Sequence, residues 1–127
     1  MDDLLLDLKK DIFYRAKIFI DDMGEFIPFG SQLVGTEVKP VMIYDESEEI
    51  IEGLKLINRL KDNFSNKLIN NSIQVAAVAY DVFINTPDTN GETVKRNALC
   101  LMISTDGENW SEDYYPYQVV NNECIWG

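Results

Sequence analysis

The alternation of apolar and polar positions along the chain is organised around one long stretch, residues 72–84. This stretch is rich in β-branched and aromatic residues and contains no Gly or Pro. Alternate side chains of a strand face opposite sides, and here both sides are apolar. The pattern therefore predicts a central strand covered on both faces. Residues 95–105, which are also apolar on both sides, predict the strand that returns beside it after a turn over residues 86–92.

Two segments show helical periodicity. Apolar residues at spacings of three and four from Leu5 to Met23 predict a first helix, starting at Asp2 or Asp3 and running to about residue 22. The second helix is expected to begin in the acidic run 45–49 and to end at residues 70–71. Acids in its first turn and lysines in its later turns match the helix dipole, which explains the local charge without a ligand.

Shorter strands are predicted over residues 25–34, 38–44 and 114–120. Each contains a proline, which cannot donate to a strand ladder. The strands over 25–34 and 38–44 are therefore expected at a sheet edge or with a bulge. The segment 26–30 places aromatic residues around a rigid proline, which suits either a recognition surface or the core. Residues 121–127 show no regular pattern.

The resulting order, α-β-β-α-β-β-β, predicts a single α+β domain over residues 1–127. We expect an approximately five-stranded, mainly antiparallel sheet with two helices packed on it. Both helices are expected on one face, in preference to one helix on each face. The second apolar face would then be bare, which favours a homodimer or a dedicated protein partner. The alternative, equally open from the sequence, is that loops and the C-terminal tail cover that face.

Charge restricts the kind of partner. The chain has 22 acidic and 11 basic residues, a net charge of −11, and no Lys or Arg follows Arg96. This balance argues against nucleic acid and against anionic membrane surfaces, whose binding requires positive charge. It fits a basic protein partner, and it also fits the general use of acidic residues for solubility. With no signal-peptide core and no membrane span, we expect a cytoplasmic protein.

The residue types needed for common catalytic chemistry are missing. The sequence has no histidine, which excludes Ser-His-Asp and Cys-His arrangements. It also has no glycine-rich nucleotide loop of the usual kind. Cys100 and Cys124 do not have zinc-site spacing, and Cys100 lies in an apolar run, as a buried small hydrophobe does. We therefore expect no catalytic residue, cofactor or metal.

Asp81 and Tyr80 form a candidate buried polar site in the central strand. A buried carboxylate has a raised pKa unless it is paired, and it then suits acid or base work. It equally suits a structural role, accepting hydrogen bonds from the backbone or from Asn97. In an alternative function, the two residues supply polar contacts to a small molecule bound between helices and sheet.

Aromatic residues gather near the C-terminus. Such residues are enriched at interface hot spots, although they also fill cores. We take five of them as candidate partner-binding residues: Trp110, Tyr114, Tyr115, Tyr117 and Trp126.

Four segments together resemble a group of known proteins: residues 25–30, 76–84, 98–103 and 114–117. Their pattern is similar to that of small acidic bacterial proteins of uncharacterised function, some of which resemble immunity proteins of polymorphic-toxin systems. The resemblance supplies no catalytic residue, and it implies a protein-binding role. The sequence thus predicts a non-enzymatic domain that binds a basic protein partner or itself.

Overall fold

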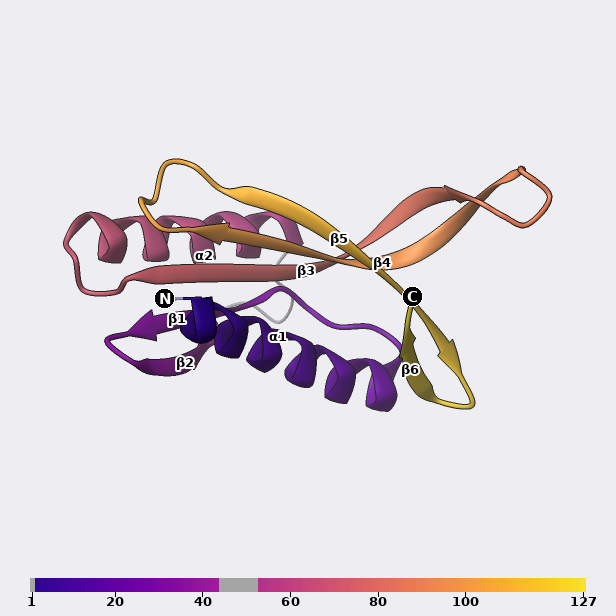
Figure 1. The fold of residues 1–127 in the computed structure, drawn as a ribbon, viewed down its shortest axis with the longest axis horizontal. Helices are drawn as coiled ribbons and strands as arrows, with labels where there is room; N and C mark the ends of the chain where they lie inside the picture. The colour runs from indigo at the N-terminus through magenta and orange to yellow at the C-terminus, as the bar shows by residue number, and fades with distance from the viewer. Residues whose placement is uncertain (1, 44–52) are drawn as a thin grey trace.

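The computed structural model describes residues 2–43 and 53–127. These residues form two helices and a six-stranded sheet in which neighbouring strands run antiparallel, in the order β2-β1-β3-β4-β5-β6 (Figure 1). The elements in chain order are α1 (Asp2–Met23), β1 (Phe29–Val34), β2 (Glu37–Val41), α2 (Gly53–Ile69), β3 (Val75–Pro87), β4 (Thr93–Ser104), β5 (Ser111–Val120) and β6 (Glu123–Trp126). The α+β class is confirmed, with one strand more than predicted. The expected start of the second helix, residues 45–49, lies outside the described residues.

The central position of β3 is confirmed. It lies between β1 and β4, and Ala76, Ala77, Val78 and Ala79 are completely buried. The long, two-sided apolar pattern of the sequence therefore corresponds to a strand with a hydrophobic core on each side.

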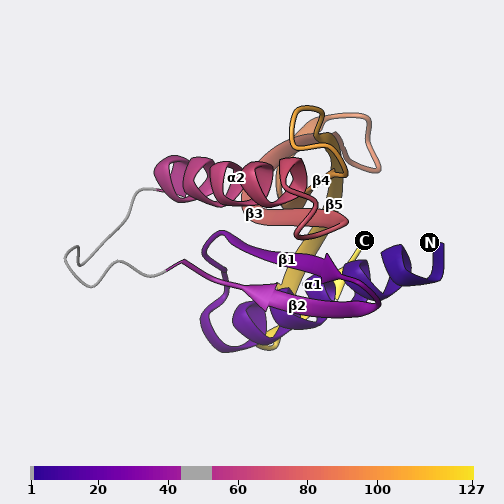
Figure 2. The same cartoon turned by 90° about the vertical axis from the view of Figure 1, so that its left-hand side faces the viewer.

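The placement of the helices differs from the prediction, because one helix covers each face of the sheet (Figures 1 and 2). Helix α1 packs its buried stripe of Leu8, Ile12, Ala16 and Ile20 on the face that carries Val75, Ala77 and Ala79. Helix α2 packs Leu60, Phe64 and Leu68 on the face that carries Ala76 and Val78. The expectation of two helices on one face is wrong. The argument for a homodimer from a bare sheet face therefore loses its support in the described residues.

The prolines act as predicted in β2 but not in β1. Pro40 lies in β2, which is an edge strand. Strand β1 is interior, and it avoids the problem because it begins at Phe29, immediately after Pro28. Gly30 within β1 allows α2 to approach closely, since a Cβ atom there would lie 2.7 Å from the ring of Phe64.

The C-terminal tail, expected to be irregular, forms strand β6. Asn121 and Asn122 have positive φ angles of 52° and 62°, which is the backbone of a two-residue type I′ hairpin turn. Strand β6 pairs with the end of β5, and its Cys124 N–H donates to the Asp21 carboxylate of α1 at 2.6 Å. The two consecutive asparagines, a residue type that readily adopts positive φ angles, are the sequence signal for this turn.

Candidate functional site

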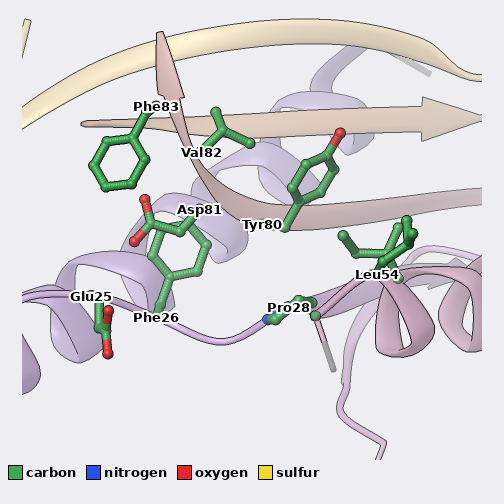
Figure 3. A pocket seen from close by; sticks show the side chains of 10 residues that line it. Glu25, Phe26, Pro28, Leu54, Tyr80, Asp81, Val82 and Phe83 are labelled. Carbon is green, nitrogen blue, oxygen red and sulfur yellow. The ribbon is translucent and has the colours of Figure 1, made fainter. Parts of the chain in front are cut away.

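A pocket opens where β1 and β3 part. Strand β1 pairs with β3 only from Val75 to Ala79, and the chain that precedes β1, up to Pro28, does not pair with β3. The space between this chain, β3 and the start of α2 is a pocket of about 470 Å³ (Figure 3). We call it the β3 cleft, and its lining residues are Glu25, Phe26, Pro28, Gly53, Leu54, Ile57, Tyr80, Asp81, Val82 and Phe83.

Asp81 is the polar centre of the α1 side of the β3 cleft. The buried Tyr117 hydroxyl lies 2.8 Å from each of its two carboxylate oxygens and donates to them. Burial raises the pKa of Asp81, and the charge of Glu25 adds to this rise, while hydrogen bonds from Tyr117 and from the backbone of Phe26 and Val82 oppose it. The sequence suggested Asn97 as a hydrogen-bond donor to Asp81, and in the structure Tyr117 is such a donor.

Tyr80 contributes its ring to the cleft but directs its hydroxyl elsewhere. As the neighbour of Asp81 in a strand, it faces the opposite, α2 side of the sheet. Its hydroxyl donates to Glu112 of β5 at 3.3 Å, and the Tyr114 hydroxyl donates to the same carboxylate oxygen at 2.8 Å. Burial is the main cause that raises the pKa of Tyr80. The two residues of the predicted polar site therefore both line the cleft, with their polar groups on opposite faces of the sheet.

The charged side chains in the lining of the β3 cleft are both acidic. Glu25 and Asp81 supply them, and the remaining lining is largely apolar, with Leu54 and Ile57 from α2 and Pro28 from the chain before β1. Lys95 lies next to the cleft, where its ammonium group stacks on the Phe83 ring at 4.3 Å from the centroid. The cleft thus combines apolar walls with a local negative charge.

Two of the predicted partner-binding aromatics meet at a second hollow. The Phe13 ring of α1 lies edge-on to Tyr115 at 4.9 Å and to Trp126 at 5.1 Å between ring centroids. With Pro116 and Gly127, these three rings line a pocket of about 380 Å³, which we call the aromatic groove. Nothing in the helical pattern of α1 distinguished Phe13 from a core residue.

The other predicted aromatics do not line the aromatic groove. Tyr117 is buried, with 1% of its surface exposed, and its ring contacts Trp126 at 5.8 Å. Trp110 and Tyr114 are on the α2 side, where Trp110 contacts the core of that face and Lys61 stacks on its ring. Because successive strand side chains alternate, the five residues do not form one surface.

The described residues show no sign of a metal centre or a membrane span. Within residues 2–43 and 53–127, no three or more cysteine or acidic side chains gather in a way that would hold a metal ion. Neither described helix has an apolar run long enough to cross a bilayer. Comparison with known proteins gives no matching family model, no matching curated protein and no matching solved structure.

Proposed function

We propose that this chain is a non-enzymatic protein-binding domain that recognises a basic partner through the β3 cleft. The observation that carries the proposal is the pair of acids, Asp81 and Glu25, in an otherwise largely apolar pocket. Such a pocket matches a Lys or Arg side chain, whose aliphatic stem packs on apolar walls while its charged head meets carboxylates.

The overall charge supports the same kind of partner. A net charge of −11 attracts a basic protein at long range and speeds its association. The sequence resembles small acidic bacterial proteins, some of which are immunity-like, and this resemblance also favours a protein partner. We propose an immunity-like role of this kind.

Binding is favoured over catalysis by the state of Asp81. Its carboxylate already accepts hydrogen bonds from Tyr117, and the chain has no histidine to act with it as a second proton carrier. We therefore assign Asp81 to ligand binding and Tyr117 to holding Asp81 in position. The aromatic groove lies on the other side of Tyr117, and Tyr115 and Trp126 there are a second proposed contact area for the partner.

A small cationic molecule in the β3 cleft is the second candidate ligand. The volume of about 470 Å³ falls in the range of ligand pockets, roughly 300–1,000 Å³. In this case the same two acids would bind an isolated amine or guanidinium group.

An array of randomised heptapeptides with Arg, Lys, Gln or Glu at the central position tests the proposal. We expect the protein to bind a subset with central Arg or Lys, and the Glu25→Gln and Asp81→Asn variants to bind these peptides about fivefold more weakly or worse. Glu108→Gln, which removes the same charge from an exposed turn, is the matched control and should keep full affinity. Arginine amide is assayed in parallel to represent the small-molecule alternative. Binding without a preference for a central cation, or equal losses in the control, would contradict the proposal.

A further inference from the structure

Among the described residues, one edge of β3 has no strand partner where it borders the β3 cleft. Strand β4 pairs with β3 from Ala76 to Pro87, whereas β1 pairs with it only from Val75 to Ala79. Within the described residues, positions 80–87 therefore have a strand neighbour on one edge alone. Alternate residues of such a segment direct their N–H and C=O groups to the open edge, which makes it a template for another strand.

The path of the chain before β1 explains why the edge is open. Continuing the register in which Phe29 lies opposite Ala79 would place Pro28 opposite Tyr80 and Phe26 opposite Val82. Pro28 cannot donate to a ladder, and the backbone of Phe26 is instead hydrogen-bonded to the Asp81 carboxylate. The chain thus joins the sheet only at Phe29, and the β3 cleft lies beside the part of β3 that β1 does not reach (Figure 3).

We infer that the β3 cleft binds an extended segment of a basic polypeptide by strand addition, with the segment's backbone pairing to residues 80–83 and a Lys or Arg side chain opposite Asp81. This inference rests on the proposed function and specifies how the partner binds. A strand opposite four residues spans about 13 Å. In an antiparallel pair, directly opposite side chains share one face, with Cβ atoms about 4.5–5.5 Å apart, so the cation would reach the carboxylate.

The two faces of the cleft define which side chains such a segment carries. The residues on either side of the cation would point to the opposite face, where Leu54 and Ile57 of α2 line the cleft. Leu54 is 70% exposed, so a bound apolar side chain would cover it. The expected motif is a cationic residue between two apolar ones, with backbone bonds giving affinity and alternate side chains giving specificity.

A second copy of this chain suits the open edge less well. Two copies would bring net charges of −11 together, and each would present Asp81 at the same edge. Charge complementarity therefore favours a basic segment from another protein.

An N-methyl scan of the best central-Arg heptapeptide from the array tests strand addition. Methylation removes one backbone donor at a time. We therefore expect affinity to fall about tenfold at alternate residues among the four that pair with residues 80–83, and to change little at the other residues of the peptide. A scan without this alternation, with binding that still depends on Asp81, would overturn strand addition and leave the proposed function intact. The absence of any cation-dependent peptide binding would overturn both.

A protein variant gives an independent measurement. Leu54→Ser should weaken binding of the same heptapeptide several-fold, because the flanking apolar residue loses its contact. Ile69→Ser is the matched control, since Ile69 lies at the far end of α2 and is similarly exposed, at 63%. Equal affinities of the Leu54→Ser variant and the unsubstituted protein would contradict the proposed placement of the segment.

Discussion

Replacing Tyr117 by Phe removes the hydroxyl group that donates to Asp81 of the β3 cleft and leaves the aromatic ring in place. The hydroxyl lies 2.8 Å from both oxygens of Asp81, and Tyr117 is only 1% exposed. A hydrogen bond to a charged group contributes about 1.5–3 kcal/mol to stability. Asp81 itself is only partly buried, so water compensates for some of the loss, and we expect about 1.5–2 kcal/mol, the lower part of that range.

Urea unfolding of the Tyr117→Phe variant measures this loss. The Tyr114→Phe variant is the control, because Tyr114 also donates to a carboxylate at 2.8 Å but is 48% exposed, and its loss should be smaller. A double-mutant cycle with Asp81→Asn isolates the pair, with an expected coupling of about 1 kcal/mol or more. Equal losses in the two Tyr→Phe variants would refute the assignment of Tyr117 as the residue that holds Asp81.

The pH dependence of the same variant follows from the direction of the Asp81 shift. Its pKa is raised in the folded protein, so its contribution to stability is fully present below the unfolded value of 3.8 and is lost as pH rises through the folded value. The hydrogen bond from Tyr117 lowers this folded pKa, and its removal raises the pKa further. The deficit of Tyr117→Phe should therefore be largest at neutral pH and decrease under acidic conditions.

Two further predictions concern contacts of the fold outside the β3 cleft. Gly30→Ala should destabilise the protein by about 1–3 kcal/mol in urea unfolding, because the added Cβ would lie 2.7 Å from the ring of Phe64. Gly53→Ala is the control, since Gly53 has open space around it and its substitution should not destabilise the protein. Equal stabilities of the two variants would contradict the close approach of α2 to β1. Asp106 accepts bonds from the backbone and side chain of Asn109 and from the backbone of Glu108, which hold its pKa at about 2. The contribution of the ionised Asp106 to protein stability should therefore be lost as pH falls from 3.8 toward 2. Asp106→Asn should reduce the change in the free energy of unfolding between pH 3.8 and 2. An unchanged pH dependence would contradict the role of Asp106 as the hydrogen-bonded carboxylate of this loop.

The central hairpin and the two amphipathic helices could be predicted because their residues repeat with a clear period. The side of the sheet on which each helix lies could not, since a strand with two apolar faces accepts a helix on either one. Strand β6 depends on the positive φ angles of Asn121 and Asn122, a turn that the sequence reading took for an irregular tail.

The candidate site was only partly visible in the sequence. Asp81 stood out as a carboxylate on an apolar strand face, and its position in the cleft is now clear. The cleft itself depends on where the pairing of β1 with β3 ends. This is a tertiary feature, and Pro28 is its one local signal in the sequence. Tyr117 is a predicted partner-binding residue, but the structure shows it buried against Asp81, because its side chain belongs to the hydrophobic core on the α1 side of the sheet.

The most direct measurement is the pattern of backbone amide NMR shifts on addition of the best central-Arg heptapeptide. Our account predicts that the perturbed amides gather in residues 25–27, 54–57 and 80–83, and that the Asp81→Asn variant reaches the same changes only at about fivefold higher peptide concentration or above. Shifts centred on Tyr115 and Trp126 of the aromatic groove, or an Asp81→Asn titration that matches that of the unsubstituted protein, would contradict it.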